Sequence, residues 1–238
     1  MNPKIPINDD QLAALEADIQ AQYSKRIGEK GATPEGLFWD TEESMRTRFD
    51  AALELATFEN ASVVDVGCGF GDFYGHLLDR GIDMASYHGV DVSDVVLREA
   101  NTRWGGEELQ NVSFEQRNIL RDPFDDREFD IAVVFGTLGH RLESIDNEVY
   151  IRQFMRTCFA CADTVILNAL SIYREGDWPY EEFVYYYDPA KVFGYAQELS
   201  RNVRLRHDIE PIPQREFLIL FEDDGLARTR AGITELDS

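Results

Sequence analysis

The segment VVDVGCGFGDFYGHL, residues 63–77, contains a short apolar run, then glycines on alternate positions, and then a helical pattern. Glycine loses more conformational freedom on folding than any other residue, so three glycines within five positions indicate a special turn. The apolar run predicts a buried strand, and the residues after the turn predict a helix. Gly67, Gly69 and Gly71 therefore predict a strand–turn–helix unit whose turn lets a ligand approach the backbone.

Strand and helix patterns alternate along the rest of the chain. Strands separated by helices predict parallel crossover units, with helices on both faces of the sheet. The last two strands are joined by a short turn that contains proline, which leaves no room for a crossover helix and predicts an antiparallel hairpin. The seven expected strands cover residues 62–67, 87–93, 112–118, 129–136, 163–171, 203–210 and 216–223. The predicted fold class is α/β, with a Rossmann-like seven-stranded sheet that is mostly parallel and ends in an antiparallel hairpin.

Composition excludes several classes of partner. The formal net charge is −22, from 45 acidic residues against 23 Lys and Arg. A field of that sign repels a phosphate backbone, so we expect no nucleic-acid partner. No run of about 18 apolar residues is present, which predicts no membrane association. The N-terminus carries no basic-then-apolar signal pattern, so the expected location is cytoplasmic.

The cysteines indicate a reducing compartment without a metal site. Their number is three, which does not suit a disulfide framework. Cys158 and Cys161 form a C-x-x-C pair inside a predicted helix, with no second Cys or His pair nearby. We interpret both as small buried residues and expect no bound metal.

Acidic residues around the glycines indicate the ligand. Asp91 ends the next strand, and an acid at that place can accept hydrogen bonds from both ribose hydroxyls of an adenosine. The dinucleotide fingerprint G-x-G-x-x-G would need a third glycine where Asp72 stands. Asp65 and Asp72 would repel a pyrophosphate, whereas a sulfonium with a free ammonium group would be attracted. The pattern therefore points to S-adenosyl-L-methionine (SAM).

These motifs resemble those of class I SAM-dependent methyltransferases. VVDVGCGFG resembles their motif I and GVDVS their motif II, while FDIAVVFGTL is similar to their fourth strand and its loop. QRNIL lies where the family commonly has an acid–aliphatic pair, so the resemblance implies that Asn118 and Ile119 hold the adenine. The cofactor-binding residues expected in the core are Asp65, Gly67, Gly69, Asp91, Val92, Asn118, Ile119, Phe135 and Gly136.

A narrower resemblance covers residues 36–53. GLFWDTEESMRTRFDAAL is similar to a helix of small-substrate bacterial members that reads roughly W-x-x-x-E-S-Q-x-x-R-F. This resemblance implies that Arg48 pairs with the methionyl carboxylate and that Trp39 covers the cofactor. Met45 stands in place of the Gln of that pattern. We expect one compact domain, in which residues 1–60 form N-terminal helices over the cofactor site and residues 61–238 form the core.

Candidate catalytic residues lie after the fourth and fifth strands. Methyl transfer is a displacement at a cationic sulfonium that needs an aligned nucleophile and sometimes a base. His140 is the expected base, because an imidazole titrates near neutrality. Tyr173 and Tyr186 are further catalytic candidates, and the Tyr185–Tyr187 run is a candidate aromatic wall that stabilises the sulfonium.

The expected reaction is methylation of a small polar metabolite or biosynthetic intermediate. The loop FGTLGH, residues 135–140, lacks the Asn/Asp-Pro-Pro-aromatic sequence of nucleobase amino-methyltransferases. One alternative is an intramolecular cyclase that resembles azetidine-2-carboxylate synthases and releases methylthioadenosine. Another is a SAM-sensing interaction protein without catalysis. The sequence leaves these alternatives open.

Overall fold

A seven-stranded sheet forms the centre of the computed structural model, which describes residues 7–105, 111–173, 181–209 and 215–225. The strands lie in the order β3-β2-β1-β4-β5-β7-β6. Their bounds are Ser62–Val66 (β1), Ser86–Asp91 (β2), Val112–Gln116 (β3), Phe129–Val134 (β4), Ala162–Leu170 (β5), Asn202–Arg206 (β6) and Glu216–Glu222 (β7). The predicted number of strands is therefore confirmed.

The pairing of the strands confirms the predicted topology. Strands β3, β2, β1, β4 and β5 are parallel, whereas β7 pairs antiparallel with both β5 and β6. From β1 the chain proceeds outward to β2 and β3, and then returns to place β4 on the other side of β1. Open α/β sheets bind ligands beside such a reversal, at the carboxyl ends of the strands.

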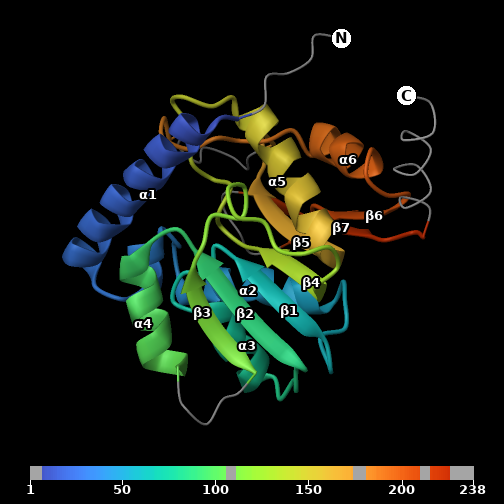
Figure 1. Cartoon of the computed structure of the whole chain (residues 1–238), viewed down its shortest axis with the longest axis horizontal. Coiled ribbons are helices and arrows are strands. Elements are labelled where there is room, and N and C mark those ends of the chain that lie inside the picture. The colour runs from blue at the N-terminus through green and yellow to red at the C-terminus, as the bar shows by residue number, and fades with distance from the viewer. Residues whose placement is uncertain (1–6, 106–110, 174–180, 210–214, 226–238) are drawn as a thin grey trace.

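Helices cover both faces of this sheet (Figure 1). Helices α5 and α6 contribute buried side chains to the core on one face, and α2, α3 and α4 contribute to the core on the other. The helices are α1 (Asp9–Lys30), α2 (Glu42–Leu53), α3 (Asp72–Asp79), α4 (Asp94–Trp104), α5 (Asn147–Cys161) and α6 (Pro189–Gln197), with a short 3₁₀ helix η1 (Pro34–Leu37).

Helix α6 is absent from the sequence-based prediction. The Asp188 side chain caps it by accepting from the Ala190 amide at 2.9 Å. Pro189 occupies the first helical position, where its fixed φ suits a helix start. Val192 and Ala196 then pack into the core beneath it.

Helix α1 lies beyond the carboxyl ends of the strands and is held there by polar contacts (Figure 1). The Gln11 side chain donates to the Ser144 carbonyl at 2.7 Å, and the Gln20 side chain donates to the Val92 carbonyl at 3.1 Å. Glu16 forms an ion pair with Arg121 at 2.9 Å. These partners follow β4, β2 and β3 in the chain, so α1 bridges three loops.

Neighbouring side chains leave no room for a Cβ at two glycines of the turn after β1. Gly67 and Gly71 have φ values of +80° and +73°, in the left-handed region that favours glycine. A Cβ on Gly67 would lie 2.0 Å from the Thr137 hydroxyl oxygen, and one on Gly71 would lie 2.6 Å from the Trp104 ring. The glycine spacing predicts the close approach of a ligand, and in the structure the Thr137 and Trp104 side chains also lie close to this turn.

The sequence predicts no membrane-spanning helix and no metal site, and the described residues can be searched for both. Within them, no helix has the length and apolar character needed to cross a membrane. The same residues contain no group of three or more His, Cys, Asp or Glu placed to hold a metal ion. The three cysteines are buried and free.

The close packing of α3 against Trp104 predicts opposite effects for one substitution at two helical glycines. A Cβ on Gly75 would lie 2.6 Å from the Trp104 ring, whereas one on Gly28 in α1 would meet nothing within 4 Å. We expect Gly75→Ala to lower the free energy of unfolding by roughly 1–3 kcal/mol through overpacking. We expect Gly28→Ala to raise it by about 0.5–1 kcal/mol through helix propensity.

Urea unfolding of both variants and the wild type measures this difference. Equal stabilisation by the two alanines would show that Trp104 moves aside without cost.

Candidate functional site

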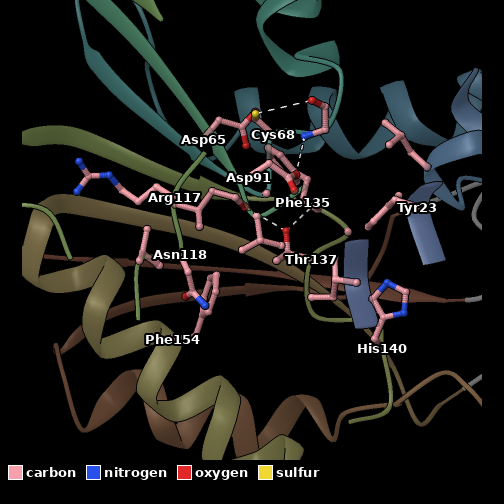
Figure 2. Close-up of a pocket in the computed structure, with 18 of the residues that line it drawn as sticks. Tyr23, Asp65, Cys68, Asp91, Arg117, Asn118, Phe135, Thr137, His140 and Phe154 are labelled. Atoms are coloured by element: carbon pink, nitrogen blue, oxygen red, sulfur yellow. Dashed lines mark hydrogen bonds between the residues drawn. The ribbon is translucent and has the colours of Figure 1, made fainter. Parts of the chain in front are cut away.

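A pocket lies between α1 and the carboxyl ends of β1, β2 and β4 (Figure 2). We call it the first pocket. Its walls come from α1, from the glycine turn, and from the loops that follow β2, β3 and β4. Residues on helix α5 close one side, among them Tyr150 and Phe154. The pocket is therefore at the place that the strand order predicts for a ligand.

Most of the predicted cofactor-binding residues line this pocket. Those that do are Trp39, Asp65, Gly67, Gly69, Asp91, Val92, Asn118, Ile119, Phe135 and Gly136. They come from distant parts of the chain and are brought together by the sheet. Arg48, which the narrower resemblance placed beside them, does not line the first pocket.

The Asp91 carboxylate is held in place by two backbone amides. One oxygen accepts from Gly69 N at 3.1 Å and the other accepts from Ser93 N at 2.9 Å. The side chain is buried, and this burial raises the pKa of the Asp91 carboxyl to about 6. Asp91 thus presents an oriented acceptor to the pocket without a cation beside it.

Asp65 is a second buried acid in the first pocket. The Tyr87 hydroxyl donates a hydrogen bond to it. Burial, reinforced by the charge of Asp91, raises the pKa of the Asp65 carboxyl to about 7. The pocket lining includes one cation, Arg117, which is already paired with Glu115 at 2.6 Å. The interior therefore favours a ligand that carries positive charge.

One end of the first pocket is formed by Arg117, Asn118 and Phe154 (Figure 2). The Asn118 amide nitrogen donates to Glu16 at 2.7 Å, and its oxygen accepts from Leu120 N at 3.0 Å. These bonds fix the orientation of the carboxamide, and the buried side chain of Ile119 lies beside it. At this end the apolar side chains of Ile119 and Phe154 therefore lie beside a carboxamide whose orientation is fixed.

Tyr23 and His140 lie at the opposite end (Figure 2). Their rings meet edge to face, with centroids 6.2 Å apart. Loss of solvation lowers the pKa of the His140 imidazole, so the ring is neutral near pH 7. Among the described residues, no side chain forms a hydrogen bond with this ring. The imidazole nitrogens are therefore open to a bound molecule.

A second pocket adjoins the first at this end; its empty space, including the open solvent at its mouth, is about 1360 Å³. The residues common to both pockets are Tyr23, Leu37, Trp39, Gly136 and His140. The two pockets thus share one wall, and His140 is part of it. A molecule in one pocket would meet a molecule in the other beside this imidazole.

Arg48 lies in the second pocket, where it forms a buried ion pair with Glu216. Its Nε donates to a Glu216 oxygen at 2.7 Å, its Nη2 donates to the other oxygen, and its Nη1 donates to Ser44 O. Asn168 donates to the same carboxylate and accepts from Gly136 N at 2.8 Å. The guanidinium is therefore engaged by the protein, and the structure does not bring it to the first pocket.

The predicted tyrosines also lie outside both pockets. Tyr173 is 54% exposed, and its ring is near His207. The Tyr186 hydroxyl accepts from Glu181 N at 3.5 Å. Tyr187 is buried in the core, and Tyr185 donates to Glu148. The aromatic rings at the junction of the two pockets instead come from Tyr23 and Trp39.

Sequence reasoning missed three residues that shape the site. Tyr23 and Glu16 both belong to α1 and line the first pocket, and the sequence predicts neither as a site residue. Glu216 directly precedes the apolar run 217–221 of β7, and an acid beside such a buried run is the available signal that a buried cation faces it.

Comparison with known proteins identifies a domain in the central part of the chain. Residues 63–158 match the model of a family described as methyltransferase domain. The sequence has no match among curated proteins.

Solved structures similar to this one include methyltransferases. Magnesium protoporphyrin IX methyltransferase (ChlM) from Synechocystis PCC 6803, with bound SAH, is 13% identical with a TM-score of 0.63, and the match covers 90% of this chain and 100% of that chain. The methyltransferase domain of bacterial CtHen1 is 21% identical with a TM-score of 0.54, covering 76% and 100%.

A third similar structure is phosphoethanolamine N-methyltransferase 1 of Haemonchus contortus, in complex with phosphoethanolamine and S-adenosylhomocysteine. It is 12% identical with a TM-score of 0.61, and the match covers 94% of this chain and 55% of that chain. At these identities the similarity concerns the fold.

The buried charge of Asp65 predicts a pH-dependent effect of Asp65→Asn. In the unfolded chain this carboxyl ionises at about pH 4, whereas the folded protein keeps its proton up to about pH 7. Wild-type stability is therefore lost as pH rises between these values and stays lower above them. We expect Asn, which can still accept from Tyr87, to add on the order of 2 kcal/mol more stability at pH 8 than at pH 5.

Urea unfolding of wild type and variant, without ligand at both pH values, measures this. A difference between the two proteins that does not change with pH would show that Asp65 is ionised at pH 5 in the folded state.

Proposed function

We propose that this chain, whose residues 63–158 match a methyltransferase-domain model and whose fold is that of class I SAM-dependent methyltransferases, transfers the methyl group of SAM to a small molecule. The observation that carries the proposal is the shared wall between the two pockets at His140 and Gly136. One pocket would hold the donor and the other the acceptor. Their junction is where a methyl group would pass.

The residues of the first pocket fit SAM. Asp91 would accept hydrogen bonds from the two ribose hydroxyls, because its carboxylate is already oriented by the Gly69 and Ser93 amides. Asp65 would lie near the ammonium and sulfonium charges. Asn118 and Ile119 would flank the adenine at the opposite end. SAM carries net positive charge near its sulfur, and this matches the acidic interior.

The size of the second pocket supports transfer to an acceptor over cyclisation within SAM. A cyclase needs no second substrate and would be expected to have a small acceptor space with aromatic rings around the sulfonium. Here the second pocket, with the open solvent at its mouth included, has about 1360 Å³ of empty space, against about 930 Å³ for the first on the same basis. The tyrosines expected to form an aromatic cage, Tyr185–Tyr187, line neither pocket.

His140 would serve as the base. When bound, SAM supplies an electrophilic methyl group on a sulfonium. The neutral imidazole can accept a proton from the acceptor, and it is held in place because Asn147 donates to its backbone carbonyl at 2.8 Å. Trp39 and Tyr23 would exclude water from the junction, since both line the two pockets.

We also propose that the helices within residues 1–60 cover the donor site. Support comes from α1, which contributes Leu15, Glu16, Ile19 and Tyr23 to the first pocket. A small molecule is the proposed partner, and nucleic acid is disfavoured by the net charge of −22.

Removing the Asp91 carboxylate should weaken SAM binding. We expect Asp91→Ala to lower SAM affinity by very roughly 2–4 kcal/mol, because two hydrogen bonds to a charged group are lost. Asp83 precedes the other end of the same strand and is exposed, so Asp83→Ala is the matched control. Isothermal titration calorimetry on folded variants measures both effects. Unchanged affinity in Asp91→Ala would remove this residue from the site.

The products formed from SAM distinguish transfer from cyclisation. With SAM alone we expect almost no enzyme-dependent turnover, because no nucleophile lies behind the methyl carbon. With a suitable acceptor present, we expect S-adenosylhomocysteine. Mass spectrometry of the reaction, with boiled protein and Asp91→Ala as controls, measures these products. Enzyme-dependent methylthioadenosine together with azetidine-2-carboxylate would refute the methyltransferase proposal in favour of the cyclase.

A further inference from the structure

The second pocket combines aromatic walls with an excess of acidic groups. Aromatic or imidazole rings from α1, from the segment after η1 and from the loops facing it line the space; they belong to Tyr23, Phe38, Trp39, His140 and Phe183. Its charged side chains are four carboxylates and two guanidinium groups, from Glu35, Asp40, Glu181, Glu216, Arg26 and Arg48. Methyl transfer by itself requires neither these rings nor this excess of acidic groups, so the lining indicates which kind of acceptor the pocket would bind.

Both guanidinium groups are already engaged by the protein. Arg48 donates from Nε and Nη2 to Glu216 and from Nη1 to a backbone carbonyl. The Arg26 Nε donates to the Glu35 carbonyl at 2.7 Å, and its guanidinium lies 4.3 Å from the centre of the Phe38 ring. An anionic substrate could use only the terminal amino groups of Arg26, and it would face the four carboxylates of the lining.

Only one carboxylate of the lining has an ion pair among the described residues, because Glu216 is neutralised by Arg48. Glu35, Asp40 and Glu181 form no ion pair with any described residue, and Glu35 has the charges of Lys30 and Arg26 near it. Asp40 is exposed and Glu181 is half-buried. The open part of the pocket therefore has a negative potential, which favours cations over anions.

The aromatic rings of the second pocket also favour a cationic ligand. Phe38 contacts Tyr23 and His140 edge to face, with centroids 5.6 Å apart in both cases, and Phe183 lies 6.4 Å from it. Aromatic faces attract cations and also bind apolar groups. A molecule with a cationic end and an apolar body would use both properties.

We propose that the acceptor is an organic amine that binds in its ammonium form, carries an apolar body, and has no carboxylate or phosphate. This inference rests on the proposed function, because it concerns the acceptor pocket of that reaction. On binding, the ammonium is placed near Asp40 and Glu181, and the apolar body lies against the rings of Tyr23 and Phe38. For the reaction the ammonium gives one proton to the neutral His140 imidazole, the freed nitrogen lone pair forms the bond to the methyl carbon, and the methyl–sulfur bond breaks to leave S-adenosylhomocysteine.

Two matched series of probes test the proposal. Phenethylamine, 2-phenylethanol and 3-phenylpropionate share one body, and tryptamine, tryptophol and indole-3-propionate share another. Calorimetry on the full chain saturated with S-adenosylhomocysteine is expected to give at least 10-fold tighter binding for an amine than for its alcohol, and no measurable binding of the acids. An alcohol or acid that binds as tightly as its amine would overturn the proposal, as would the failure of both amines to bind.

A pair of neighbouring variants tests the role of the carboxylate. Glu181→Gln is expected to weaken amine binding at least 5-fold and to leave binding of S-adenosylhomocysteine unchanged. Glu182→Gln is the matched control, since Glu182 is exposed and does not line the second pocket. The exposed Asp40→Asn provides a second test with little risk to folding. Unchanged amine affinity in both Glu181→Gln and Asp40→Asn would overturn the assignment of the cationic end.

Binding of S-adenosylhomocysteine itself separates the two proposals. If it binds and the amines do not, only the choice of acceptor is wrong. If neither SAM nor S-adenosylhomocysteine binds, the proposed function fails, and the inference about its acceptor fails with it.

Discussion

The hydrogen bond from the Gly69 amide to the Asp91 carboxylate joins the ends of β1 and β2, and the first pocket is built around it. The two strands are parallel neighbours in register, so the turn after one meets the acid that ends the other. Only a turn with positive φ values aims the amide in this direction, and this accounts for the glycines. The hydrogen bond keeps the Asp91 carboxylate oriented, although burial disfavours the charged form of this group. A cationic ligand in the first pocket would favour the charged form of Asp91, which burial disfavours.

A second network fixes the wall between the two pockets. The Arg48–Glu216 ion pair connects α2 to β7, and Asn168 of β5 connects the same carboxylate to the Gly136 amide. Both charges are almost fully buried and their polar atoms have partners, so loss of one member would leave the other uncompensated. The network therefore positions the loop after β4, which carries His140, relative to the sheet.

Local patterns predicted the fold and the first pocket well, because a strand, its turn and the next helix are adjacent in sequence. Asp91 and Gly69 could be placed together from strand alternation alone. Contacts between side chains that are far apart in the sequence form only when the chain packs, and local patterns do not predict them. Arg48 lies 168 residues from Glu216, and nothing near Arg48 indicates that its carboxylate comes from the protein and not from a ligand. Tyr186 lines neither pocket, and strand-like alternation does not show which side chains of its segment face one.

The position of α1 has a consequence for synthesis on the ribosome. Its residues are translated first, but the carbonyls that its glutamines contact follow 72 and 133 residues later. At about 5–20 residues per second, the helix waits for several seconds to tens of seconds before its docking surface exists. It buries only two side chains fully, Leu12 and Leu15, so it can remain solvated during that time. Helix α1 is thus made before the loops onto which it docks.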